Sequence, residues 1–291
     1  MELRVLKYFL EAARDGNITK AAARLHITQP TLTRQLHQLE DELGVKLYNR
    51  GSYNIRLTPE GILLKKRAQE IIDLEEKVKN EFAAANDEIS GVVYIGAGES
   101  AGMAFIGKIL KNLINKYPKV KYRMISEDRE GVSWKLDRGL IDFGVFVGKA
   151  NLDKYNYIVL PDSDRWGVLV LKDDALAAKG FAEAEDLLGR PLLASHQAVS
   201  EGEFEEWLGY SEANLNIVGT HNLIYNASVM LRERLGILLT IDGIIDTEFE
   251  GSELKFLPLR PEIKARLALA WKKDAVFSQA AAKFLEIANN I

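Results

Sequence analysis

Residues 21–36 of this 291-residue chain read AAARLHITQPTLTRQL, and this stretch decides the fold of the N-terminal part. Thr28 is a candidate helix cap, because its hydroxyl can accept a hydrogen bond from a free amide of the first turn. Pro30 then falls in that first turn, where a backbone N–H has no partner within the helix. Leucines continue at helical spacing to Leu43, and Gly44 is typical of the residue that follows a helix. The pattern predicts a helix over residues 29–43.

Two more helices are expected before this one. Apolar residues recur at helical spacing over residues 3–13, until residues 15–17 (Asp-Gly-Asn) interrupt them. Thr19 is a candidate cap for a short helix over residues 20–25, whose alanines allow close packing. Because a turn of about three residues separates this short helix from the next one, the pair forms a helix-turn-helix outline.

The helix expected at residues 29–43 has two contrasting faces. Its leucines form a narrow apolar stripe, and the opposite face has no acidic residue before Glu40. Short polar, amide and basic side chains on that face suit base edges and phosphates. The residues expected to contact DNA there are Thr28, Gln29, Pro30, Thr31, Thr33, Arg34 and Gln38. Residues 45–57 are interpreted as two short strands forming a wing, from which Arg50 and Tyr53 would contact phosphates or the minor groove.

A long helix is predicted from residue 59 onward. Thr58 as cap, Pro59 in the first helical position and Glu60 in the first turn make a strong start signal. Residues at alternating steps of four and three then form a coiled-coil seam with one polar interruption: Leu64, Ala68, Ile71, Glu75, Val78, Phe82 and Ala85. The alternative is an amphipathic helix packed on its own domain. We favour dimerisation, because one helix-turn-helix contacts one half-site and two-fold pairing supplies the second.

Charge is divided unevenly along the chain. The net charge is −4, yet residues 1–58 hold nine basic and six acidic residues, and the remainder is acidic. The composition, with 47% hydrophobic residues, excludes wholesale disorder, and the absence of cysteine excludes disulfides and thiolate chemistry. The N-terminus lacks the apolar core of a signal peptide, and no run of about 18 apolar residues occurs. We therefore expect a cytoplasmic protein with no membrane partner.

Beyond residue 90 the pattern alternates between strand and helix. Strands are expected at residues 92–95, 120–125 and 142–147, with helices at 104–115 and 134–140 between them. This order predicts a parallel sheet with ligand chemistry at the carboxyl ends of its strands. A second run has strands at residues 166–171, 191–194, 236–240 and 265–271 and a final helix at 280–287. Together the two runs predict two α/β lobes with a cleft between them.

These motifs together resemble one family. Residues 21–36, with Leu39-Glu40, Leu43-Gly44 and Leu47, resemble the winged helix of LysR-type transcriptional regulators, and Thr58-Pro59-Glu60-Gly61 resembles the start of their linker helix. Looser similarity to the family's effector domain includes Ile95-Gly96-Ala97, residues 139–145 and residues 186–189. The resemblance covers essentially the whole chain and is sharpest over residues 1–65.

The resemblance implies an α+β multidomain protein. It would have a winged helix-turn-helix at residues 1–58, a linker helix at 59–88 that pairs subunits, and a periplasmic-binding-protein-like effector domain at 89–291. That domain would comprise lobe I (89–161 and 267–291) and lobe II (162–266). The implied function is activation or repression of transcription through altered promoter binding or bending. The implied partners are double-stranded promoter DNA, a small-molecule effector, RNA polymerase and other copies of the chain in a homodimer or homotetramer.

The resemblance also places an effector in the inter-lobe cleft. The residues expected to line it are Ser100, Glu127, Asp128, Phe146, Val147, Ser195, His196, Gln197, Asn222 and Thr240, with His221 beside them. Ser100 at a helix start suits a carboxylate, whereas Glu99, Glu127 and Asp128 would oppose an anion if they pointed inward. The effector is therefore expected to be a small polar metabolite of undecided charge, and no cofactor is implied.

Other functions fit the sequence less well. Residues 98–102, GESAG, match the G-x-S-x-G pattern of hydrolases around Ser100, but the strand before them opens its domain without the earlier strands that a nucleophile elbow needs. The same glycines match a dinucleotide loop only weakly, since no acidic residue lies about 20 residues further on. The four histidines lack metal-ligand spacing. A solute-binding sensor without DNA would leave the polar face of residues 29–43 unexplained, so we expect a regulator and not an enzyme.

Overall fold

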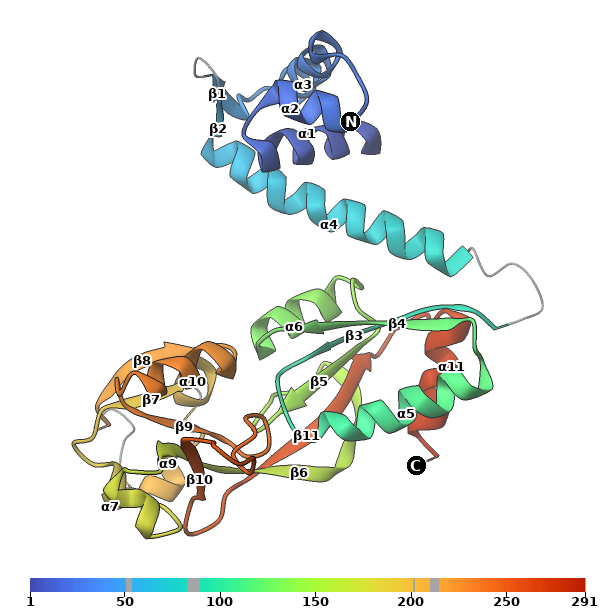
Figure 1. Cartoon of the computed structure of the whole chain (residues 1–291). Coiled ribbons are helices and arrows are strands. Elements are labelled where there is room, and N and C mark those ends of the chain that lie inside the picture. The colour runs from blue at the N-terminus through green and yellow to red at the C-terminus, as the bar shows by residue number, and fades with distance from the viewer. Residues whose placement is uncertain (51–53, 83–88, 201, 210–214, 291) are drawn as a thin grey trace. The chain divides into compact units, whose positions relative to one another are not determined.

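The structure is a computed structural model of the chain, and it describes residues 1–50, 54–82, 89–200, 202–209 and 215–290. The chain divides into two compact units, residues 1–83 and 84–291. The first is drawn in blue to cyan and the second in green to red (Figure 1).

The first unit contains the predicted winged helix-turn-helix. Its elements are α1 (Leu3–Asp15), α2 (Ile18–Arg24), α3 (Gln29–Leu43), β1 (Tyr48–Arg50), β2 (Ile55–Leu57) and α4 (Pro59–Phe82). β1 and β2 pair antiparallel as the wing. Phe9 from α1, three leucines of α3 and Leu47 before the wing are at most 1% exposed. Leu32, Leu36 and Leu39 thus form the core face of α3, whereas Leu43 at its end is exposed, and the polar face points outward.

The ends of α3 lie where the sequence predicts them. The Thr28 hydroxyl accepts a hydrogen bond of 3.4 Å from the amide of Thr31, and Gly44 ends the helix in the left-handed region with φ +69°. The start predicted for α2 is wrong by two residues. Its cap is Asn17, whose side chain accepts from the amide of Lys20 at 3.0 Å, and Thr19 lies inside the helix. Asn and Thr are both good caps, so residue type alone does not decide between two neighbouring positions.

The start of α4 is fixed to the wing by Thr58. Its hydroxyl donates to the carbonyl of Lys46 (2.6 Å) and accepts from the amide of Gly61 (3.0 Å). Gly61 allows a very close approach, because a Cβ at this position would lie 1.9 Å from the carbonyl oxygen of Leu47. The first turn of α4 therefore rests directly on the backbone that enters the wing.

The predicted seam of α4 is divided between two environments. Ala68 is fully buried against Leu6 of α1, and Leu64 packs on the same core, so this half of the seam serves its own subunit. Glu75, the polar interruption, forms an ion pair of 2.8 Å with Lys7 of α1. The seam is therefore not a dimer contact along its whole length, because these residues contact α1 of the same chain. Ala85 lies outside the described residues. The later apolar positions are exposed: Ile71 (36%), Leu74 (42%), Val78 (43%) and Phe82 (78%).

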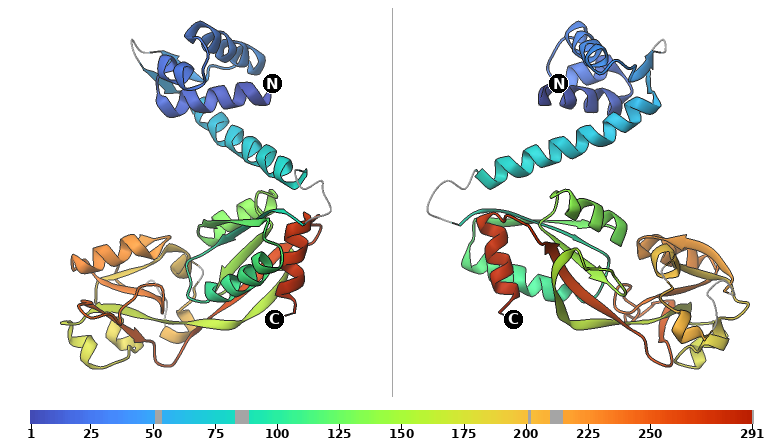
Figure 2. Two further views of the ribbon diagram at one scale, coloured as in Figure 1. Left: turned by 45° about the vertical axis from the view of Figure 1, so that its right-hand side comes forward. Right: turned by 180° about the vertical axis from the view of Figure 1, so that it is seen from behind.

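The second unit is built on one sheet that runs through two lobes (Figure 1). In the first lobe β3 (Gly91–Ala97) pairs in parallel with β4 (Val120–Ser126) and β5 (Phe143–Val147), as predicted. β11 (Lys264–Lys272) adds to β5 in the antiparallel direction. The helices are α5 (Met103–Lys116), α6 (Arg129–Asp137) and α11 (Gln279–Ala288). α5 and α11 lie together on one face of this sheet, seen from behind in Figure 2, and α6 packs on the other.

The second lobe has a similar core of parallel strands. β7 (Leu192–Ser195) pairs in parallel with β8 (Ile217–His221) and with β9 (Ile237–Ile241). β10 (Leu254–Pro258) pairs with β6. The helical segments are the 3₁₀ turn Ala175–Ala178, α7 (Ala184–Leu187), α8 (His196–Ser200), α9 (Glu205–Leu208) and α10 (Ile224–Arg232).

A single long strand joins the lobes. β6 (Tyr155–Leu171) pairs with β11 in the first lobe and with β9 and β10 in the second. The two α/β lobes are thus confirmed, but only residues 166–171 of this strand were predicted, and β8, β10 and α10 were not. α6 begins five residues earlier than predicted, because the carboxylate of Asp128 caps it by accepting from the amide of Gly131 at 2.9 Å.

Candidate functional site

The outward face of α3 is a polar surface made largely of residues expected to contact DNA. Thr28, Gln29, Pro30, Arg34 and Gln38 are exposed, and Thr31 and Thr33 are half-buried. The amide of Gln29 donates to the hydroxyl of Thr33 at 2.9 Å, and the hydroxyls of Thr28 and Thr31 are hydrogen-bonded at 2.8 Å. These bonds hold the first turn in one arrangement. Within the described part of the chain, neither Arg34 nor Gln38 forms a hydrogen bond or ion pair, so both side chains extend from this face.

The first acidic residue of α3 does not face outward. Glu40 is 3% exposed and accepts hydrogen bonds from the amide of Leu47 (2.8 Å) and the ammonium of Lys46 (2.9 Å). Burial raises the pKa of Glu40, but these bonds outweigh it and hold the pKa below its ordinary value. Its negative charge is therefore paired with Lys46 at the entry to the wing and does not reach the polar face.

The two strands of the wing carry one described basic side chain. Arg56 on β2 is exposed, and β2 is paired with β1 along its whole length. Tyr53 and the side chain of Arg50 lie outside the described residues, so their predicted contacts stay predictions.

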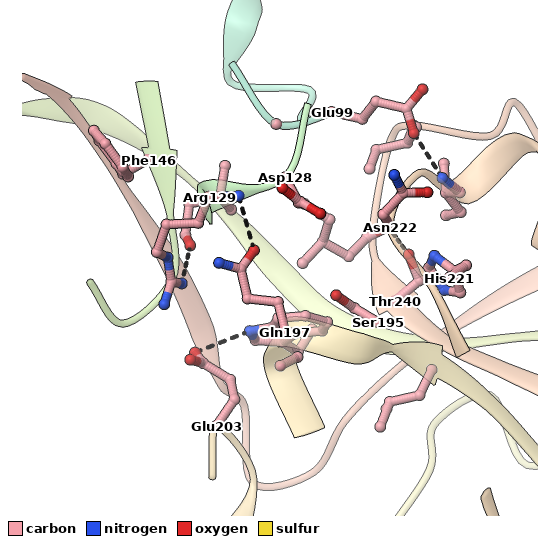
Figure 3. Close-up of a pocket in the computed structure, with 18 of the residues that line it drawn as sticks. Glu99, Asp128, Arg129, Phe146, Ser195, Gln197, Glu203, His221, Asn222 and Thr240 are labelled. Atoms are coloured by element: carbon pink, nitrogen blue, oxygen red, sulfur yellow. Dashed lines mark hydrogen bonds between the residues drawn. The ribbon is translucent and has the colours of Figure 1, made fainter. Parts of the chain in front are cut away.

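A cavity of about 100 Å³ lies between the lobes of the second unit. It is lined by residues at or just after the carboxyl ends of β3, β5, β7, β8 and β9. Figure 3 shows the side chains around it. Seven of the predicted effector residues line it, together with His221: Asp128, Phe146, Val147, Ser195, Gln197, Asn222 and Thr240. Ends of neighbouring strands meet here as expected for a parallel α/β sheet.

Three predicted residues are placed elsewhere. The Ser100 hydroxyl accepts a hydrogen bond from the amide of Gly102 at 2.9 Å, Glu127 pairs with Lys135 at 3.0 Å, and His196 is exposed. None of the three lines the cavity. Among the described residues no histidine bonds to Ser100, so the hydrolase alternative gains no support from the geometry.

Charged residues that the sequence did not single out as ligands also line the cavity. Glu99 accepts a hydrogen bond of 2.7 Å from the amide of Ile224, the first residue of α10. Arg129 donates to the carbonyl of Val147 at 2.9 Å, and burial lowers its pKa while the nearby Glu203 carboxylate opposes that change. Glu203 is 6% exposed. Glu203 follows no strand and carries no local signal, whereas Arg129 could have been found as the neighbour of Asp128.

Among the described residues, three hydrogen bonds that involve residues lining this cavity connect the lobes. Besides Glu99 and Ile224, the amide of Arg129 donates to the side chain of Gln197 (3.3 Å), and the amide of Lys149 donates to Glu203 (3.1 Å). Each bond joins a residue of the first lobe to one of the second. The lobes are therefore held together by polar contacts, which a ligand can replace or reinforce.

Several polar atoms at the cavity are buried without a partner. Both ring nitrogens of His221 and Nε2 of Gln197 have no hydrogen bond within the described part of the chain. Burial lowers the pKa of His221, so its imidazole is neutral near pH 7. Because buried polar groups are nearly always paired in proteins, these atoms mark the cavity as a place for a polar ligand.

The described residues contain no group of three His, Cys, Asp or Glu side chains able to hold a metal ion. Over the same residues, no helix has the length and apolar character needed to cross a bilayer.

Each of the two units matches a known protein family. Residues 3–62 match the family "Bacterial regulatory helix-turn-helix protein, lysR family", and residues 86–290 match "LysR substrate binding domain". The regulator MJ0300 of Methanocaldococcus jannaschii is 30% identical over 75% of this chain and 76% of its own length. YtlI of Bacillus subtilis is 33% identical over 64% of this chain and 60% of its own length. The fold is similar to the crystal structure of CbnR, a LysR family transcriptional regulator. The TM-score is 0.78, the sequence identity is 19%, and the match covers 100% of this chain and 99% of CbnR.

The chain belongs to the LysR family of helix-turn-helix transcriptional regulators. It is a DNA-binding transcriptional regulator that joins a winged helix-turn-helix to an effector-binding domain.

Proposed function

We propose that this regulator binds a small-molecule effector in the inter-lobe cavity and changes promoter binding or bending in response. The observation that carries the proposal is the set of unpartnered buried polar atoms of His221 and Gln197, which lie beside hydrogen bonds that join the lobes. A ligand that pairs with these atoms alters the balance between closed and open lobes. We propose no enzymatic activity and no cofactor for this protein, and we propose that it works in the cytoplasm.

The DNA-contacting residues are assigned to the polar face of α3. Gln29, Pro30, Thr33 and Arg34 would contact base edges in the major groove, with Thr28, Thr31 and Gln38 beside them on bases or phosphates. Arg50 and Tyr53 of the wing would contact phosphates or the minor groove. Arg34 is the strongest candidate for a bidentate contact with guanine, since its guanidinium is exposed and makes no bond to the described residues.

Homodimers or homotetramers would supply a second half-site, and RNA polymerase would be the partner in activation. Support for self-association comes from the exposed apolar residues of α4, which a monomer would leave in water. Ile71, Val78 and Phe82 are the proposed contacts. Leu64 has only a supporting role, because it packs on its own winged helix.

Arg34→Ala tests the DNA interface. The substitution should weaken binding to a promoter fragment by about 1–3 kcal/mol, since it removes a base contact but no packing. Arg67→Ala on α4 is the matched control, because Arg67 is also exposed and pairs with Glu70 at 2.9 Å. Gel-shift titrations at two salt concentrations separate base contacts from phosphate contacts. An Arg34→Ala protein with the affinity of the wild type would remove α3 from the proposed interface.

A further inference from the structure

The charged side chains around the inter-lobe cavity do not balance one another. Arg129 is the only basic side chain among the described lining residues, and its guanidinium is held by the carbonyl of Val147 beside the Glu203 carboxylate (Figure 3). Glu203 in turn accepts hydrogen bonds from the main-chain amide of Lys149 and from the indole of Trp166. The Glu203 carboxylate thus opposes the positive charge of Arg129 at one end of the cavity.

Two carboxylates remain at the other end. Asp128 uses one oxygen to cap α6 and Glu99 uses one oxygen on the amide of Ile224. The second oxygen of each has no partner among the described residues. Figure 3 shows the Asp128 carboxylate directed toward the side of the cavity that carries His221 and Asn222. Two half-buried carboxylates whose second oxygens have no basic partner among the described residues repel an anion and attract a cation.

The neutral groups opposite these carboxylates add hydrogen bonds but no positive charge. The imidazole of His221 offers one donor and one acceptor, and Nε2 of Gln197 is a donor with no partner in the described part of the chain. A ligand that satisfies them needs an uncharged or carbonyl acceptor at a distance from its cationic group. The cavity of about 100 Å³ holds roughly seven to ten non-hydrogen atoms, taking ~10–15 Å³ for each water-sized group.

We infer that the effector of this regulator is a small protonated amine, whose ammonium binds Asp128 and Glu99 and whose acceptor group binds Gln197 and His221. The inference rests on the proposed function, in which the inter-lobe cavity is the effector site. It specifies the charge of a ligand that the sequence left undecided.

Matched probes of opposite charge test this inference on the full-length protein. Calorimetric titration would compare 4-amino-1-butanol and L-lysine with 4-hydroxybutanoate and glutarate. At least one amine should bind and none of the acids should bind at equal concentration. Asp128→Asn and Glu99→Gln should each weaken amine binding at least tenfold, because both remove a charge while keeping the acceptor that caps a helix. Glu130→Gln, which changes an exposed carboxylate of α6 outside the cavity, should leave it unchanged.

Three outcomes of these titrations would overturn the inference. Tighter binding of an acid, binding of neither class, or amine binding that survives both Asp128→Asn and Glu99→Gln would each contradict it. The proposed function fails differently. If an acid binds, and Ser195→Ala or Thr240→Ala abolishes that binding, the cavity remains the effector site and only its charge preference is overturned. If no cavity substitution changes any DNA response of the regulator, the effector site itself is rejected.

Discussion

The Glu99 carboxylate of the first lobe accepts a hydrogen bond of 2.7 Å from the main-chain amide of Ile224, the first residue of α10 in the second lobe. α10 has no side-chain cap of its own, because its N-cap position is occupied by Leu223. A residue 125 positions away thus satisfies an amide that most helices satisfy locally. The helix start and the closure of the lobes depend on the same contact.

Glu99→Ala should therefore open the lobes. Loss of a hydrogen bond to a charged group costs about 1.5–3 kcal/mol, enough to move a closed equilibrium at least tenfold toward open forms. Because the chain has no cysteine, spin labels at Lys108→Cys and Glu185→Cys, one in each lobe, report the distance between lobes directly. The labelled Glu99→Ala protein should show a longer and broader distance distribution than the labelled wild type. Glu99→Gln, which keeps the acceptor, should resemble the wild type, and an identical distribution in Glu99→Ala would contradict the role of this contact.

The sequence predicted the ends of a helix well where a residue type is favoured there for a single physical reason. Thr28, Pro30 and Gly44 each satisfy a different requirement of a helix end, so the bounds of α3 followed from the sequence. The parallel order of β3, β4 and β5 followed from the alternation of short apolar runs with helices. β6 was only partly visible, since residues 155–165 run between lobes and carry polar residues that break the apolar pattern.

The cavity was harder to predict because it is made by contacts between distant segments. Strand ends placed Asp128, Ser195, Gln197 and Thr240 correctly near one another. Glu203 was missed since it lies on a turn after α8 and is brought to the cavity only by bonds from Lys149 and Trp166. No periodicity in the chain encodes such a contact. The pairing of charges around Arg129, from which the ligand's charge was inferred, exists only in three dimensions.

Gly61 should not tolerate a side chain, whereas Gly107 should. Gly61→Ala places a Cβ 1.9 Å from the carbonyl of Leu47, so α4 must move off the wing, at a cost of about 1–3 kcal/mol. Gly107 lies inside α5 with no atom within 4 Å of its Cβ position, and Gly107→Ala should stabilise by about 0.4–1 kcal/mol. Hydrogen exchange in peptides from residues 44–63 should accelerate in Gly61→Ala only. Unchanged exchange there would mean that the contact with Leu47 relaxes without loss of stability.

His221 should make the stability of the second unit depend on pH. Burial holds its pKa below the ordinary value of 6.5, so the unfolded chain binds a proton more readily than the folded one. The stabilisation is fully present above pH 6.5 and is lost as the pH falls through the folded pKa. His221→Gln removes this group, so the unfolding free energy of the wild type should fall relative to that of the variant from pH 7.5 to pH 5. Urea unfolding at a series of pH values measures it, and a difference that stayed constant over this range would show that His221 does not titrate on unfolding.

The exposed face of α4 should hold two copies of the chain together. Ile71, Leu74, Val78 and Phe82 follow at steps of three and four, so they lie on one face of the helix and leave large apolar side chains in water. Val78→Glu with Phe82→Glu should reduce the mass measured by light scattering, to that of a monomer if this face makes the only contact. Lys65→Glu changes the net charge by the same two units on another face of α4 and should leave the mass unaltered. An oligomer that survives the double substitution would place the subunit contact elsewhere, and Ile71→Glu with Leu74→Glu would then test the first half of the same face.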